Sequence, residues 1–127
     1  MSTTFFKLEQ SRIDQALQAY VRAVGDDPNV LAVVLFGSLA RGDATAMSDA
    51  DVLLLLAGST EPFHTRIPSY LRCGVGIAMD VFPYTLDEAR QMLDDESGIV
   101  SVALREGIWL LERGKVRERV LAHSTAA

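Results

Sequence analysis

The spacing of apolar positions changes several times along the chain and predicts alternating helices and strands. From Ser11 to Val24, apolar residues recur every three or four positions with polar residues between them, so an amphipathic helix is predicted that ends at Gly25. Val30–Phe36 and Val52–Leu56 are continuous apolar runs, and each is too short for a helix. They predict two central strands of a sheet that is covered on both faces.

The second half of the chain continues the alternation with shorter elements. Two further strands are predicted, over Gly76–Phe82 and Ile108–Leu111. Thr85 is a suitable N-cap, and helices are predicted after it over three segments: Leu86–Leu93, Ile99–Arg105 and Lys115–Leu121. Pro62 and Pro68 argue against a regular helix within Thr60–Arg72. The alternation predicts an α/β fold.

Length and charge limit the classes of protein to be considered. The chain has 127 residues, which suits one domain over 1–127 with a fraying tail over 122–127. It carries 12 basic and 17 acidic residues, a formal net charge of -5, and no basic run, so direct nucleic acid binding is not expected. The longest apolar run, Val52–Ala57, cannot span a membrane, and no signal-peptide pattern is present. A cytoplasmic location is predicted, and the lone Cys73 excludes an internal disulfide.

A glycine and a serine follow the first predicted strand. Gly37 and Ser38 precede Leu39–Arg41, which has the length of one helical turn. Glycine lets the backbone approach a ligand closely, and the N–H groups at a helix start favour phosphate oxygens. Such a turn by itself more often only redirects the chain.

Three acidic residues strengthen this interpretation. Asp49 and Asp51 are two positions apart, so both carboxylates are expected on one face of the second strand. Asp80 lies inside an apolar strand segment, where a half-buried carboxylate is costly unless it is paired or bound to metal. The linker Gly37–Ser48 is too short for a parallel crossover, so the first two strands are expected to be antiparallel. Three carboxylates beside a phosphate-binding turn predict a two-magnesium site for phosphoryl or nucleotidyl transfer.

These residues resemble a known signature. Gly37-Ser38, then Asp49-x-Asp51 and a later Asp80 are similar to the pattern of the DNA polymerase β-like nucleotidyltransferase superfamily. Within it, the chain resembles the minimal nucleotidyltransferases, the MNT or MntA-type partners of HEPN proteins. The resemblance implies a mixed β-sheet with flanking helices, two Mg²⁺ ions and ATP. It also implies an antitoxin role, in some members through transfer of AMP onto a tyrosine of a HEPN toxin.

The resemblance also implies a role for each matching residue. Gly37 and Ser38 would contact the triphosphate, and Asp49 and Asp51 would bind the metals. Asp80 would be the third carboxylate and would take the proton of the attacking hydroxyl. Arg41 matches an arginine of the family, and it either neutralises phosphate or pairs with an acid such as Asp43. The position of the nucleotide base is not predicted.

Three functions are compatible with the sequence. The first is Mg²⁺-dependent transfer of AMP from ATP to a protein hydroxyl by the antitoxin of a HEPN toxin. The second is nucleotide transfer to a small molecule with the help of a partner subunit, because the chain has no additional helical domain to hold that molecule. The third is a non-catalytic antitoxin that covers its toxin, and the intact Asp49, Asp51 and Asp80 argue against it.

Overall fold

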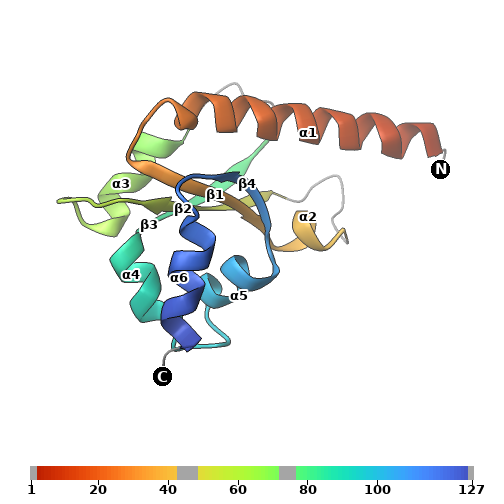
Figure 1. Cartoon of the computed structure of the whole chain (residues 1–127). Coiled ribbons are helices and arrows are strands. Elements are labelled where there is room, and N and C mark those ends of the chain that lie inside the picture. The colour runs from red at the N-terminus through yellow and green to blue at the C-terminus, as the bar shows by residue number, and fades with distance from the viewer. Residues whose placement is uncertain (1–2, 43–48, 72–76, 126–127) are drawn as a thin grey trace.

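The computed structural model describes residues 3–42, 49–71 and 77–125, with side chains for 10–42, 49–71 and 77–122. Its described strands form one sheet in the order β3-β2-β1-β4. Their bounds are Val30–Phe36 for β1, Ala50–Leu56 for β2, Met79–Thr85 for β3 and Ile108–Glu112 for β4. Helices cover both faces of this sheet (Figure 1). The prediction of an α/β fold with a mixed sheet and flanking helices is confirmed.

The two most apolar strands occupy the centre of the sheet. Every residue of β1 except Leu31, and every residue of β2 except Asp51, is buried. β1 pairs with β2 in antiparallel orientation, as the short linker between them predicts. β2 pairs with β3 in parallel orientation, and β4 pairs with β1 in antiparallel orientation. Because β1 and β2 have neighbours on both sides, their backbone groups are satisfied by strand pairing.

Two apolar cores lie on opposite faces of the sheet. One core lies under three helices of the C-terminal half: α4 (Leu86–Met92), α5 (Ile99–Glu106) and α6 (Val116–Thr125). The other contains side chains of α1 (Thr3–Gly25), α2 (Ser38–Arg41) and α3 (Phe63–Tyr70). Figure 1 shows α1 on the side of the sheet opposite α4, α5 and α6. Alternate strand residues therefore enter different cores, as the period of a strand requires.

Several element boundaries differ from the sequence-based predictions. α1 begins at Thr3 rather than near Ser11, and α6 continues to Thr125 rather than ending near Leu121. β3 is shifted towards the C-terminus and contains Pro83. Proline is compatible with this strand because β3 is at the sheet edge, where one side of the backbone has no strand partner. The fraying of the tail stays a prediction, and Cys73 lies outside the described residues.

The expectation of no regular helix within Thr60–Arg72 is wrong. Pro62 occupies the N-cap of α3 with an extended backbone (φ −60°, ψ 155°), so it precedes the helix and does not interrupt it. Pro68 lies inside the helix but only two residues before its end. The missing N–H group there affects one internal hydrogen bond. Tertiary contacts hold the helix in place, because Tyr20 of α1 donates a hydrogen bond to the carbonyl of Tyr70 at 2.6 Å.

A buried arginine fixes α3 to the C-terminal half of β3. Arg66 is 4% exposed and makes a two-pronged ion pair with Glu88, with N–O distances of 2.7 and 3.0 Å. It also donates to the carbonyls of Pro83 and Glu61. Glu88 accepts a hydrogen bond from the Thr85 N–H and completes the capping box of α4. The ion pair lowers the pKa of Glu88 to about 2, mainly through the hydrogen bonds from Arg66. The contacts of Arg66 therefore join α3, β3 and α4.

Candidate active site

The turn after β1 brings the backbone close to the second strand. Gly37 is the N-cap of α2 with φ 77° and ψ −153°, a conformation that essentially only glycine adopts. The Arg41 N–H donates to the Gly37 carbonyl at 3.1 Å, and Gly42 ends the helix in the left-handed conformation. A Cβ atom at Gly37 would collide with the Asp51 carboxylate. The predicted turn over Gly37 and Ser38 is thus in contact with the predicted metal ligand.

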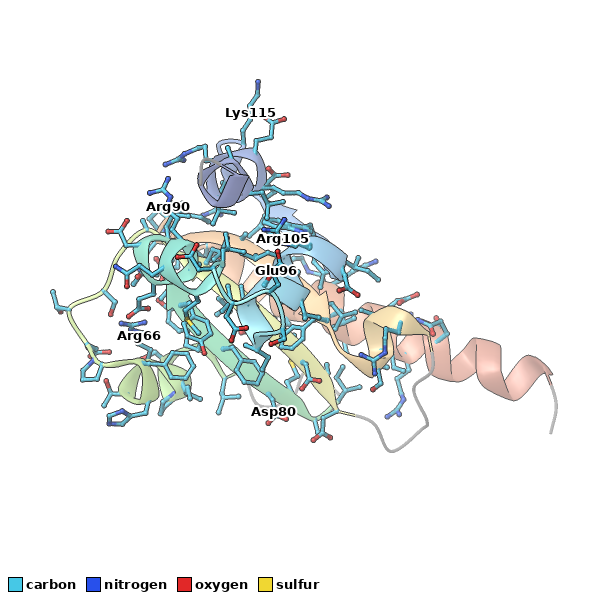
Figure 2. All side chains as sticks on the ribbon, turned by 90° about the horizontal axis from the view of Figure 1, so that it is seen from below. Arg66, Asp80, Arg90, Glu96, Arg105 and Lys115 are labelled. Carbon is cyan, nitrogen blue, oxygen red and sulfur yellow. The ribbon has the colours of Figure 1, made fainter. Side chains whose placement is uncertain are left out.

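Asp51 and Asp80 lie directly opposite each other on neighbouring parallel strands. Both occupy the second position of their strand, so they lie at the same end of the sheet. Leu53 and Phe82, two positions further along each strand, both belong to the core under α4, α5 and α6. Because side chains two apart share a face, both carboxylates lie on that face. Figure 2 shows Asp80 near the start of β3.

Asp49 immediately precedes β2 and is exposed. Burial, together with the charges of Asp80 and Asp49, raises the pKa of the Asp51 carboxyl, and the charge of Arg41 lowers it. Burial is the largest of these causes. Both Asp49 and Asp80 are therefore close enough for their charges to act on Asp51. They form one acidic cluster, which we call the carboxylate site: Asp49, Asp51 and Asp80.

The burial expected for Asp80 is wrong. Its side chain is exposed, and Asp51 is the carboxylate that is partly removed from water. The reason is the position of the strands: β3 is an edge strand, whereas β2 lies between β1 and β3. The Gly37 turn also covers Asp51 from the β1 side. Asp80 is therefore accessible to a molecule that approaches the edge of the sheet.

The carboxylate site has the chemistry of a magnesium site that needs its substrate for completion. Among the described residues, no group of three His, Cys, Asp or Glu side chains is already arranged to hold a metal ion. Mg²⁺ usually takes one or two protein carboxylates together with substrate phosphates and water. Asp51 and Asp80 supply two carboxylates on adjacent strands, and their repulsion would be relieved by a cation. The residues present therefore fit magnesium bound together with a nucleotide triphosphate.

Arg41 is near enough to affect Asp51 and is exposed at the end of α2. This agrees with both alternatives for Arg41, pairing with an acid and neutralising phosphate. Asp43, one of the acids considered for that pairing, lies outside the described residues. Arg41 also lines a small space with Gly37 and Glu106, where the end of α5 approaches α2.

A pocket of about 210 Å³ lies beside Asp80 and was not predicted. Its walls come from α3 with the residue that follows it and from the first half of β3, and it is lined by Phe63, Ile67, Leu71, Met79, Asp80, Val81 and Phe82. Asp80 is the only charged residue among them. The spacing of Phe63, Ile67 and Leu71, four residues apart, is typical of one face of a helix. This helical spacing is visible in the sequence, but Pro62 and Pro68 favour the prediction of no regular helix there.

Comparisons with known proteins agree with this geometry. The family model described as a nucleotidyltransferase domain matches residues 13–118. The chain belongs to this nucleotidyltransferase family. The resemblance that the sequence motifs indicated is thereby confirmed, and the matched region contains every residue of the carboxylate site and of the Gly37 turn. No curated protein sequence matches the chain.

Two solved structures show the same nucleotidyltransferase fold. A candidate nucleotidyltransferase from Sulfolobus solfataricus is 23% identical, with a TM-score of 0.57 over 84% of this chain and 87% of that one. A toxin-antitoxin structure with AMP-PNP is 18% identical, with a TM-score of 0.60 over 87% of this chain and 82% of that one. At these identities the likeness concerns the fold. None of the helices in residues 3–42, 49–71 and 77–125 is long and apolar enough to cross a membrane.

Proposed function

We propose that this nucleotidyltransferase transfers AMP from ATP to a hydroxyl group of a partner protein and acts as the antitoxin of a HEPN-type toxin. The observation that carries the proposal is the register of the sheet. It places Asp51 opposite Asp80 on one face of the sheet, while Gly37, at the end of β1, contacts Asp51 from the side away from β3. A phosphate-binding turn and two carboxylates therefore meet at one end of the sheet.

Each residue has a role in this proposal. The backbone of Gly37 and Ser38 binds the triphosphate, because the glycine leaves no side chain between the turn and the ligand. Asp49, Asp51 and Asp80 would hold two magnesium ions, which would neutralise the charge of the phosphates. Arg41 adds a positive charge at the same end of the sheet.

The reaction exchanges the phosphoanhydride bond between the α- and β-phosphates of ATP for a phosphate ester bond to the acceptor. The acceptor oxygen attacks the α-phosphorus, the bond to the β-phosphate oxygen breaks, and pyrophosphate leaves. Asp80 receives the hydroxyl proton, because its exposed carboxylate is accessible at the edge of the sheet. Asp51, which is partly buried, keeps its position through the contact with the Gly37 turn.

The acceptor approaches from the side of β3. Across the sheet the order is the Gly37 turn at β1, Asp51 on β2, Asp80 on β3 and then the pocket formed with α3. The triphosphate occupies the β1 side, so the pocket next to Asp80 is the open space on the opposite side. Its lining is apolar apart from Asp80, which favours an uncharged side chain that carries a hydroxyl.

The antitoxin role rests on the family resemblance and on the fold neighbour described as a toxin-antitoxin structure with AMP-PNP. The exposed position of Asp80 at the sheet edge favours a protein substrate, because a hydroxyl group on the surface of another protein is able to reach it there. The predicted cytoplasmic location stays a prediction.

The experiment combines nucleotide binding with transfer. The protein is incubated with ATP labelled at the α-phosphate, MgCl₂ and a purified HEPN-type toxin, and the toxin is analysed by mass spectrometry for added AMP. We expect modification with MgCl₂ and none with EDTA. D80N should keep most ATP affinity in calorimetry and lose transfer by about 10²–10⁴-fold, the usual contribution of general-base help.

Two further results decide between interpretations. D94N changes an exposed acid outside the site and should behave as the wild type. If the toxin is inhibited in a stable complex but carries no added AMP, the antitoxin acts by covering the toxin and not by catalysis. Efficient transfer by D80N would show that Asp80 is not part of the active site.

A further inference from the structure

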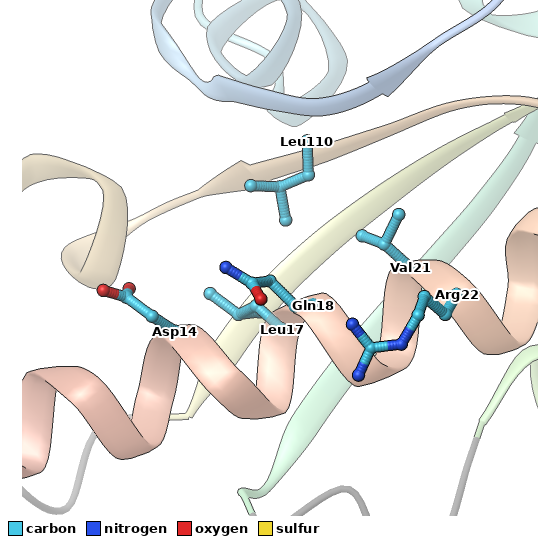
Figure 3. A pocket seen from close by; sticks show the side chains of 6 residues that line it. All are labelled: Asp14, Leu17, Gln18, Val21, Arg22 and Leu110. Atoms are coloured by element: carbon cyan, nitrogen blue, oxygen red, sulfur yellow. The ribbon is translucent and has the colours of Figure 1, made fainter.

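A groove lies between α1 and β4, on the face of the sheet opposite the one that carries Asp51 and Asp80. It has a volume of about 390 Å³ and is lined by Asp14, Leu17, Gln18, Val21, Arg22 and Leu110. Figure 3 shows Leu17 and Val21 on the side of α1 that faces Leu110 of β4. β4 is an edge strand, so no further strand of the described chain covers this side. The groove is an apolar seam with polar residues along α1.

The charged residues of the groove are arranged symmetrically. Asp14 and Arg22 are exposed and lie four residues before and four residues after Gln18. Each is therefore about 6 Å from Gln18 along the helix axis. When a second α1 helix crosses here in antiparallel orientation, each Asp14 meets the Arg22 of the other helix. The pattern is thus complementary to a second copy of itself, as an interface with two-fold symmetry requires.

The N-terminal part of α1 gives a second, independent argument. The helix has 23 residues, a length of about 34 Å, and its first turns project beyond the sheet (Figure 1). The sequence of this projecting part contains Phe5 and Phe6. Within the described chain no strand or helix packs beneath it in this view. In an antiparallel pair centred on Gln18, these turns run past the end of the other α1 helix at Gly25.

We propose that the groove between α1 and β4 is the interface of a homodimer with two-fold symmetry. The rows of residues four apart on α1 (14, 18 and 22; 17 and 21) pack into the groove of the second copy. This is the common geometry of helices that pack through such rows. Val21 and Leu110, which are half-buried in the single chain, form the apolar centre above the buried Leu17, and the two Asp14–Arg22 pairs fix the antiparallel direction. A different partner protein would have to supply the same charges in the same order, whereas a second copy does so by symmetry.

Charge reversal tests this interface directly. The full chain is examined by sedimentation velocity over a range of concentrations, and a concentration-dependent dimer is expected for the wild type. In the homodimer, D14R places a second arginine against each Arg22, and R22D places a second aspartate against each Asp14. Each variant alone should dimerise at least about tenfold more weakly, because both pairs change from attraction to repulsion.

Mixing the two variants provides the decisive measurement. In an antiparallel heterodimer of D14R with R22D, the two arginines of one chain face the two aspartates of the other, so both contacts are attractive again. A charge-swapped double variant that carries D14R and R22D in one chain also places an arginine opposite an aspartate in both pairs of its homodimer. The double variant and the one-to-one mixture of the single variants should therefore both recover the dimer that neither single variant forms by itself. Recovery also shows that both substitutions are compatible with folding.

A control variant at another face of α1 completes the design. A23R introduces the same side chain as D14R, but residue 23 is exposed and about 140° around α1 from Gln18. It should dimerise as the wild type.

Four outcomes would overturn the proposal. A wild type that stays monomeric at every concentration would exclude the homodimer. Single variants that dimerise as well as the wild type would place the interface elsewhere, and the same holds if the double variant does not recover the dimer. The charge reversals could also leave self-association unchanged and weaken only the binding of a purified HEPN-type toxin. In that case the toxin, and not a second copy, would be the occupant of the groove.

Discussion

Replacing Gly37 by alanine tests the junction of β1 and α2, because two requirements meet at this residue. Its backbone (φ 77°, ψ −153°) lies in a region that is essentially restricted to glycine. A methyl group there would also collide with the Asp51 carboxylate. The substitution therefore changes both the turn that we assign to triphosphate binding and the position of a proposed metal ligand.

The expected cost has two parts. Holding a residue other than glycine in this conformation costs about 1–3 kcal/mol. Inserting a methyl group into filled space adds about 1 kcal/mol, the low end of such effects, because the Asp51 side chain is able to rotate away. G37A should thus lower the free energy of unfolding by about 2–4 kcal/mol, or the melting temperature by roughly 10 °C for a domain of this size. ATP binding should be lost as well.

Gly42 provides a matched control in the same turn. It also has a positive φ of 79°, but no described atom lies within 4 Å of a Cβ built there. G42A should therefore cost only the conformational part, about 1–2 kcal/mol, and leave Asp51 in place. Urea unfolding followed by the fluorescence of Trp109, the one tryptophan of the sequence, measures both variants. Adding D51A to G37A should recover the steric part of the loss.

The reasoning is refuted by either of two results. Equal losses of stability in G37A and G42A would mean that the Asp51 contact has no energetic weight. An unchanged cost of G37A in the D51A background would lead to the same conclusion, since the carboxylate that the methyl group meets is then absent.

Two further predictions concern ionisable groups. D51N should raise the melting temperature at pH 7, since burial and the neighbouring acids raise the pKa of Asp51 and its ionised form destabilises the fold; the gain should vanish below about pH 4, where the carboxyl is protonated in both folded and unfolded states. E88Q should lower stability at pH 7 by about 1–2 kcal/mol, a discounted figure because the Glu88 side chain is 39% exposed. Since the folded pKa of Glu88 is about 2, below its ordinary value, this difference should be full above about pH 5 and shrink as the pH falls towards 2. Urea unfolding at several pH values measures both effects, and a pH-independent difference for E88Q would argue against the ion pair with Arg66.

The sequence alone was sufficient for features that depend on local periodicity. The apolar runs of β1 and β2 indicate central strands, and the short linker between them requires the antiparallel pairing that the structure has. The spacing of Asp49 and Asp51 predicts that they share one face, because side chains alternate along a strand. The Gly37-Ser38 turn is recognisable for the same local reason, since it follows a buried strand.

Contacts between distant segments were decided only by the tertiary structure. The parallel pairing of β2 with β3 sets Asp51 opposite Asp80, and no local pattern specifies that register. Edge and central positions in the sheet determine that Asp80 is exposed while Asp51 is partly buried. α3 forms despite two prolines because Arg66 and Tyr20 make contacts that lie far apart in sequence. Local propensity contributes little to the energy of such a short helix, so packing determines whether it forms.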